Sequence, residues 1–156
     1  MSYIVDRRNL DFLMFDMFDV ERVLAAGPFE GQDRELISQL LDTAQRIAEA
    51  EYLPSAATLD ASPPTFVNGE AVMPDDVGRA LRAYIEAGLS AQSFPPENGG
   101  LGLSHTVSMT ANGMFIAANV AIANYFLLTA AAARLLLAFG TDEQKARYAS
   151  QMIAGR

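Results

Sequence analysis

The sequence predicts an all-α fold, an orthogonal or bundle-like packing of about five or six helices. Four segments repeat their apolar residues at helical spacing, and none alternates apolar and polar residues over the length of a convincing strand. The chain has 156 residues, of which 51% are hydrophobic and 19% charged. We therefore expect one domain that buries a real core.

Residues 1–32 form an N-terminal extension in this interpretation. From Leu10 to Ala26, large apolar residues are mixed with aspartates without a clean period, and only residues 20–24 fit a helical turn. A Gly-Pro pair at 27–28 then stops the segment. We expect an extended arm that leads into a short helix and lies on a surface of the protein.

Residues 33–156 form the main helical domain. Asp33 is expected to cap a clear amphipathic helix that ends before Pro54. Residues 54–74 contain several prolines and an Asn-Gly pair, so they are expected to form a long loop. Pro74 fits the first turn of the next helix, and Gly88 fits its end.

A long uncharged stretch follows a glycine-rich turn at residues 94–103. Ser104 is expected to cap this stretch and Gly140 to end it. Because the stretch is longer than an average helix, we expect a break near Ala118–Asn119. Thr141 and Gln144 have the spacing of a capping box, so the last helix should run to about Ile153.

The same stretch has the length of a membrane span, because no charged residue lies between Glu97 and Arg134. It opens with Gly99, Gly100 and Gly102, contains Asn112, Asn119 and Asn124, and is otherwise rich in alanine. A spanning helix would have to bring those amides into hydrocarbon. We therefore expect buried helices of a core and no membrane span.

Composition excludes several classes of function. The net charge is −8, without a cluster of Lys and Arg, so neither nucleic acid nor an anionic lipid surface is an expected partner. The absence of cysteine excludes a disulfide scaffold and a cysteine nucleophile, and a single histidine makes a metal site unexpected. The first residues lack the apolar region of a secretory signal, so a cytoplasmic location is expected.

Few residues suggest chemistry. Gly100 and Gly102 could begin a dinucleotide fingerprint, but His105 stands where its third glycine belongs and no strand precedes it, so a turn with positive φ is expected. His105 itself is expected to be solvated at the start of a helix. Asn119 and Asn124 lie in an apolar stretch, where they either brace helix packing or line a ligand cavity. Residues 125–128 are most simply core.

Two longer motifs carry a resemblance to a known family. Residues 94–103 (FPPENGGLGL) and 139–156 (FGTDEQKARYASQMIAGR) closely resemble two motifs of the N-terminal helical domain of flavin-dependent acyl-CoA dehydrogenases, and they are spaced as that family spaces them. Residues 11–20 are similar to an N-terminal extension in a bacterial subgroup of that family. The resemblance covers essentially the whole chain.

The resemblance implies that the catalytic and flavin-binding residues belong to further domains, which are absent from this chain. A complete member has a helical domain, a β-domain and a C-terminal helical domain, and the last two carry the catalytic base and the main flavin contacts. No catalytic residue, FAD contact or metal ligand in this chain is therefore assigned. The 156-residue fragment is expected to be inactive alone and not to hold FAD.

What the resemblance does place in this chain is one wall of the pocket for the acyl tail. Five residues on the helix before Gly140 match it by their spacing, namely Ala123, Asn124, Leu127, Leu128 and Ala131. An apolar, uncharged helix is what a hydrocarbon tail requires. For Leu127, ordinary core packing against a neighbouring helix remains an equal alternative.

The function implied by the resemblance is that of the N-terminal part of an FAD-dependent acyl-CoA dehydrogenase, which forms a double bond between Cα and Cβ of an acyl-CoA thioester. Its implied partners are the acyl-CoA substrate, an electron acceptor and further copies in a homo-oligomer, a dimer or a tetramer. Two alternatives stay open. One is a non-catalytic, free-standing helical module for binding or assembly that is derived from this fold, and the other is an unrelated helical interaction domain.

Overall fold

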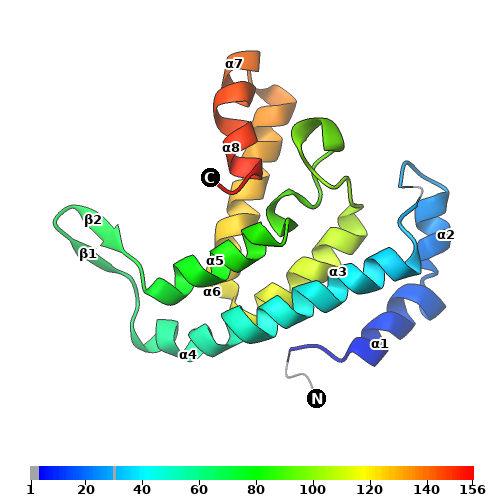
Figure 1. The fold of residues 1–156 in the computed structure, drawn as a ribbon, viewed down its shortest axis with the longest axis horizontal. Coiled ribbons are helices and arrows are strands. Elements are labelled where there is room, and N and C mark those ends of the chain that lie inside the picture. The colour runs from blue at the N-terminus through cyan, green and yellow to red at the C-terminus, as the bar shows by residue number, and fades with distance from the viewer. Residues whose placement is uncertain (1–3, 30) are drawn as a thin grey trace.

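The computed structural model describes residues 4–29 and 31–156, and it confirms the all-α fold (Figure 1). Counting α-segments that are joined through π-helical turns as one, the described residues form six helices and one small hairpin. The α-helices are α1 (Arg7–Asp11), α2 (Val20–Ala25), α3 (Arg34–Ile47), α4 (Leu53–Ala61), α5 (Asp75–Glu86), α6 (His105–Phe139), α7 (Asp142–Gln144) and α8 (Ser150–Ile153).

The N-terminal segment is helical, so the expectation of an extended arm was wrong. Asp6 caps α1 by accepting a hydrogen bond from the backbone N–H of Asn9, and a π-helical turn, Phe12–Met17, continues it. A π-helical turn is wider than an α-helical one, so the inward-facing residues fall out of α-helical spacing. Met14 and Phe15 are buried by this turn, and it explains why the pattern of apolar residues looked irregular.

The helix that begins after the cap Asp33 does not end before Pro54, as we expected. It passes through a second π-helical turn, Ala48–Tyr52, and goes on as α4 to Ala61. Proline has no N–H to donate, but it stands in the first turn of α4, where the π-helical turn has already interrupted the regular hydrogen bonds. Pro54 is therefore tolerated within a continuous helix.

A short antiparallel hairpin occupies part of the segment expected to be a loop. Strand β1 (Thr65–Val67) pairs with β2 (Glu70–Val72), and Val67 lies opposite Glu70. Asn68 and Gly69 both have positive φ, as the tight turn that suits a two-residue hairpin requires. The hairpin projects from the body of the protein, and all residues of both strands are exposed (Figure 1).

The glycine-rich turn is held against the N-terminal part of the chain by one side chain. Gln32 donates from Nε2 to the carbonyl oxygen of Gly102 and accepts from the backbone N–H of Ser104, both at 3.0 Å. Ser104 caps α6 as expected, and Gly99 and Gly102 have positive φ. Earlier in the chain, Gly88 follows the C-terminus of α5 in the left-handed conformation and ends that helix, which confirms its expected role.

Helix α6 contains the expected break. Asn119 has φ −161° and ψ 94°, which is extended backbone, whereas the residues on either side are helical. The first half of α6 lies among α3, α4 and α5, and the second half turns away toward α7 and α8 (Figure 1). Gly140 ends α6, and the capping box of Thr141 and Gln144 starts the last helix, as the sequence predicted.

The break divides the packing into a main core and a smaller second core. The main core contains buried residues from the N-terminal segment through the start of the second half of α6, with Tyr52, Tyr84 and Phe115 among its largest side chains. Among the residues that the structure describes, the buried members of the second core are Phe94, Ala133 and Ile153. It joins the distal half of α6 to the glycine-rich turn and to α8.

By length and composition alone, α6 would be able to cross a membrane. One such helix is weak evidence, because the central helix of a folded core passes the same test. Here α6 contributes buried residues to the main core along its first half and is broken at Asn119. That it does not span a membrane stays a prediction.

Candidate functional site

The five residues expected to line an acyl tail lie on the second half of α6 in three different environments. Ala123 is fully buried in the main core. Leu127 is partly buried and packs against that core, so its side chain faces the protein more than the solvent. Asn124, Leu128 and Ala131 are exposed.

The exposed members continue a longer surface that we call the α6 stripe, which consists of Val120, Asn124, Leu128, Ala131 and Leu135. These residues recur at intervals of three or four, so they share one face of the helix. Val120, Leu128 and Leu135 are 54%, 69% and 61% exposed. The α6 stripe is thus an apolar face interrupted by a single amide, and it carries no charge.

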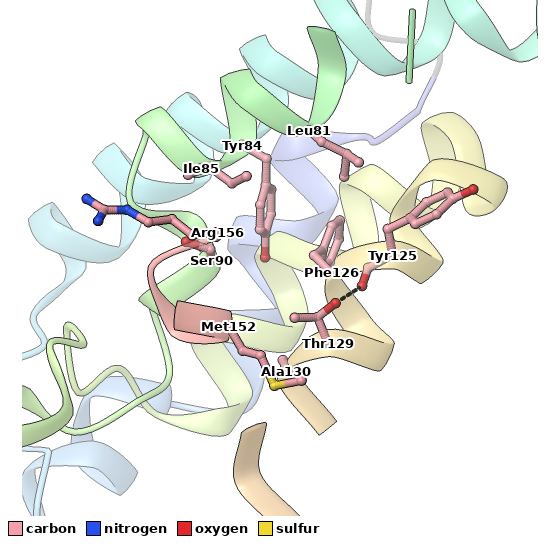
Figure 2. Close-up of a pocket in the computed structure, with 11 residues that line it drawn as sticks. Leu81, Tyr84, Ile85, Ser90, Tyr125, Phe126, Thr129, Ala130, Met152 and Arg156 are labelled. Atoms are coloured by element: carbon pink, nitrogen blue, oxygen red, sulfur yellow. Dashed lines mark hydrogen bonds between the residues drawn. The ribbon is translucent and has the colours of Figure 1, made fainter. Parts of the chain in front are cut away.

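A pocket of about 230 Å³ lies beside the α6 stripe, between α5, the second half of α6 and the end of the chain (Figure 2). Its lining residues are Leu81, Tyr84, Ile85 and Ser90 around α5, Tyr125, Phe126, Thr129 and Ala130 from α6, and Met152, Gly155 and Arg156. None of the five expected residues lines it. Its volume lies below the range of about 300–1,000 Å³ typical of drug-sized ligand sites, so it suits a small apolar group.

The burial of side chains in the second half of α6 contradicts one further expectation. Residues 125–128 were expected to be core, but only Phe126 is buried. Tyr125 is 44% exposed and its hydroxyl contacts the sulfur of Met73, while Leu128 is largely exposed. Helical spacing would have found the pocket residues, because Tyr125 and Thr129 flank the buried face that Ile122, Phe126 and Ala133 form.

A buried polar triad of Tyr84, Gln92 and Asn112 holds the Tyr84 side chain of the pocket wall in place. The Tyr84 hydroxyl donates to Asn112 Oδ1 at 3.0 Å, and Gln92 Nε2 lies 3.2 Å from the Tyr84 oxygen and 2.9 Å from Asn112 Oδ1. Burial raises the pKa of Tyr84 well above its ordinary value, so the hydroxyl stays a neutral donor. The triad ties α5, the segment before the glycine-rich turn and α6 together, and it is a structural network.

The glycine-rich turn does not offer a phosphate site. Its backbone N–H groups are used internally: that of Gly100 donates to Pro95 O, that of Gly102 to Phe94 O and that of Leu103 to Gln92 O. A Cβ on Gly100 would lie 1.9 Å from the carbonyl oxygen of Phe94, so this glycine serves close packing within the turn. The described residues therefore do not fit the pyrophosphate of FAD at this loop.

Other candidates for chemistry are solvated. His105 is exposed at the start of α6, as expected. Among residues 4–29 and 31–156, no group of three or more metal-binding side chains converges. Asn119, in contrast, is buried and braces the packing: its side-chain N–H₂ donates to Ser55 Oγ at 3.1 Å. Of the two open interpretations of this residue, the bracing one is correct.

Comparison with known proteins decides the family. Residues 35–156 match the family model of the acyl-CoA dehydrogenase N-terminal domain, which is more than half of the chain. The chain belongs to the acyl-CoA dehydrogenase family. This match, together with the all-α fold, confirms the resemblance seen in the sequence.

Two curated acyl-CoA dehydrogenases are similar over most of the chain. The 3-methylmercaptopropionyl-CoA dehydrogenase of Ruegeria pomeroyi is 26% identical over 156 residues, which is 100% of this chain and 26% of that protein. The broad-specificity linear acyl-CoA dehydrogenase FadE5 of Mycobacterium tuberculosis is 26% identical over 140 residues, which is 88% of this chain and 23% of that protein. The chain thus spans about a quarter of the length of these relatives.

Proposed function

We propose that the chain is the N-terminal helical part of an FAD-dependent acyl-CoA dehydrogenase and that the α6 stripe forms one wall of its pocket for the acyl tail. The observation that carries this proposal is the exposed, uncharged face of Asn124, Leu128 and Ala131 on a helix whose other face is anchored in the core. An isolated domain that leaves such a face open has a surface suited to cover by hydrocarbon or by further protein.

The five sequence-predicted residues have different parts in this proposal. Asn124, Leu128 and Ala131 face the tail, Leu127 borders it from its partly buried position, and Ala123 supports the helix from the core. The division between the extension 1–32 and the domain 33–156 is also proposed to hold in the complete protein. The extension nevertheless shares the main core through Met14 and Leu24.

The chemical step is assigned outside this chain. FAD, when bound, supplies the acceptor for the hydride, and the glycine-rich turn, whose amides donate within the turn, is not proposed to bind its pyrophosphate. None of the carboxylates of the described residues is buried, so none is proposed as the base that removes the α-proton. This chain contributes binding and orientation of the tail, and the fragment alone is proposed to be inactive.

The substrate class follows from the surface and from the relatives. The names of both relatives specify acyl-CoA thioesters, one with a sulfur-containing acyl group and one with linear chains. A face without charge accepts the acyl part, whereas the charged CoA part would need cations that the α6 stripe does not contain. We also propose a cytoplasmic enzyme, assembled as a homo-oligomer, that passes its electrons to a separate acceptor.

The experiment that tests the proposal uses the full-length polypeptide and a chain-length series of saturated acyl-CoAs. Reduction of an artificial electron acceptor is measured for wild type, Leu128→Trp and Ala131→Trp. A bulky side chain on the α6 stripe should lower kcat/KM for the longest substrates roughly tenfold to a hundredfold, because overpacking typically costs about 1–3 kcal/mol. Short substrates should react nearly as before.

Met109→Trp is the matched control, because Met109 is partly exposed on the first half of the same helix and lies outside the α6 stripe. It should leave the chain-length profile unchanged. Equal loss at all chain lengths in Leu128→Trp would show that the stripe packs against protein instead of the tail. A wild-type protein without any acyl-CoA-dependent reduction would reject the enzyme itself.

A further inference from the structure

The break in α6 is stabilised by the side chain of the residue that forms it. Asn119 Oδ1 accepts from the backbone N–H groups of Ala121 at 3.1 Å and of Ile122 at 3.3 Å. These donors are at the start of the second half of α6, where a helix has no earlier carbonyl to bond. Asn119 thus acts as an internal N-cap in the middle of a 35-residue helix.

The other end of the same amide is fixed by a different helix. Asn119 Nδ2 donates to Ser55 Oγ at 3.1 Å, and the Ser55 hydroxyl in turn donates to the carbonyl oxygen of Tyr52 at 2.7 Å. Ser55 is fully buried and Asn119 is 7% exposed. The break is therefore connected, through two buried hydrogen bonds, to the junction where the π-helical turn passes into α4.

An amide is the side chain that this arrangement requires. It needs an acceptor that faces the helix N–H groups and a donor that faces a serine oxygen whose proton is already committed to Tyr52. A carboxylate in the same place would keep the acceptor and lose the donor, and an alanine would lose both. Asn119 and Ser55 together set where the helix breaks and in which direction it continues.

We propose that Asn119 is a positioning residue that sets the direction of the half-helix carrying the α6 stripe, and with it the shape of the acyl-tail pocket. The effect on the acyl-tail pocket rests on the proposed function, whereas the effect on the direction of the half-helix rests on geometry alone. From Asn119 to Ala131 the half-helix rises about 18 Å, so a change of direction of about 10° at the break moves Ala131 by about 3 Å. A displacement of that size exceeds the length of two methylene groups in a tail pocket.

Three substitutions separate the cap from the brace. Ser55→Ala removes the brace and leaves the cap, Asn119→Asp keeps a cap but removes the donor to Ser55, and Asn119→Ala removes both. Thr110→Ala is the matched control, because the Thr110 hydroxyl donates to the carbonyl oxygen of Thr106 on the first half of the same helix, away from the break. The three variants at the break, and not the control, should change the direction of the second half.

The direction of the second half of α6 is measured in the 156-residue chain as the distance between two spin labels. Because the chain has no native cysteine, the labels attach only to the introduced cysteines. One label at Gly113→Cys and one at Leu135→Cys report across the break, and an uninterrupted α-helix would place these positions about 33 Å apart. A second pair, Asn124→Cys and Phe139→Cys, lies within the second half at about 22 Å. All four positions are exposed.

We expect the distance across the break to be shorter than the straight-helix value in wild type and in Thr110→Ala. In Ser55→Ala and Asn119→Asp it should shift or broaden by several ångströms, with a larger shift toward the straight value in Asn119→Ala. The pair within the second half should not change. Identical distributions in wild type and in folded Ser55→Ala and Asn119→Asp would overturn the proposal, whatever Asn119→Ala does to folding.

The consequence for the pocket is tested in the full-length enzyme. Ser55→Ala and Asn119→Asp should change the ratio of kcat/KM for long and short acyl-CoAs by at least about threefold, while kcat for the shortest substrate stays near the wild-type value. A label distance that shifts without a change in this ratio would refute the role in the pocket. Wild type without acyl-CoA dehydrogenase activity would reject the proposed function, and the label distances would still decide the role of Asn119.

Discussion

The ring of Tyr84 lies flat on the ring of Phe126, with centroids 4.0 Å apart and planes 12° from parallel. Phe115 meets both rings edge-on, at 5.0 Å from Tyr84 and 5.9 Å from Phe126. Tyr84 belongs to α5, Phe115 to the first half of α6 and Phe126 to its second half. This aromatic cluster therefore joins the two halves of the broken helix to a third element, and two of its members, Tyr84 and Phe126, line the pocket in Figure 2.

Removing Phe126 should be among the most destabilising changes in the second half of α6. Phe126→Ala deletes a buried ring from the cluster, and we expect the free energy of unfolding to fall by about 3–5 kcal/mol. Tyr125→Ala, one residue earlier and 44% exposed, should lower it by less than about 1 kcal/mol. Urea denaturation followed by circular dichroism gives both values, and similar losses in the two variants would contradict the assignment of faces.

Two buried tyrosines should respond oppositely to loss of the hydroxyl. In Tyr84→Phe, Asn112 and Gln92 lose a partner within a buried network, so stability should fall by about 1–3 kcal/mol. The Tyr52 hydroxyl is buried without a hydrogen-bond partner among the described residues. Tyr52→Phe should therefore leave stability unchanged or raise it slightly. A clear loss in Tyr52→Phe would mean that its hydroxyl has a partner, such as a bound water.

The same two tyrosines predict sensitivity to alkaline pH. Burial raises the pKa of Tyr52 and of Tyr84 above the ordinary value of 10.0. In the unfolded chain these hydroxyls ionise near pH 10, whereas the folded chain keeps them protonated, so the folded state binds more protons above that pH. Stability should thus be independent of these groups below about pH 9 and fall as the pH rises beyond about 10.

The measurement for this prediction is the melting temperature between about pH 8 and pH 11. Tyr52→Phe provides the control, because it removes one of the two groups without breaking a hydrogen bond of the described residues. Its melting temperature should fall less steeply over the alkaline range than that of wild type. Parallel curves for the two proteins would assign the alkaline loss to other groups.

Two glycines should behave in opposite ways when replaced by alanine. A Cβ on Gly100 would meet the carbonyl oxygens of Phe94 at 1.9 Å and of Ala91 at 2.7 Å, and both are backbone atoms that cannot move independently. We expect Gly100→Ala to lower stability by at least about 3 kcal/mol. Gly113→Ala adds a methyl group to an exposed helical position with open space around it, and it should stabilise by about 0.5–1 kcal/mol.

Thermal melting of both variants beside wild type checks this pair. If Gly100→Ala melted like wild type, the turn would have to adopt another backbone path. If Gly113→Ala lowered the melting temperature, the exposed side of the first half of α6 would have to be packed in solution.

The boundaries of the helices were predictable wherever a side chain caps a backbone group. Asp33, Ser104 and Thr141 are expected caps, and each accepts the hydrogen bond that its position implies. The break at Asn119 was predictable from length alone, because a 35-residue helix is far above the average. That Asn119 caps the break was not predictable, because its partner Ser55 is distant in sequence.

The departures from prediction arise where the helical period changes. The π-helical turns after α1 and α3 shift the inward-facing residues away from α-helical spacing. A search at α-helical spacing therefore predicts an extended arm at the first turn, and at the second it ends the helix before Pro54. The hairpin escaped prediction because each strand has only three residues. Its Asn-Gly pair was the available signal.

The environments of the five expected site residues were not predictable from the sequence. The resemblance assigned all five to the acyl tail, and the structure separates Ala123 in the core from Asn124, Leu128 and Ala131 on the surface. Which face of an almost uniformly apolar helix is buried depends on what packs against it, and the sequence of α6 has little polar contrast to show that.

The small second core has a consequence for how the protein opens. With Phe94, Ala133 and Ile153 as its only fully buried members among the described residues, it holds the distal half of α6 and the C-terminal helix by far less buried surface than the main core provides. These segments should form a separate cooperative unit that exchanges its amide hydrogens through partial opening, well before global unfolding. The distal part of the α6 stripe, Leu128, Ala131 and Leu135, would then lie on a weakly protected segment, and whatever covers it should increase the amide protection there.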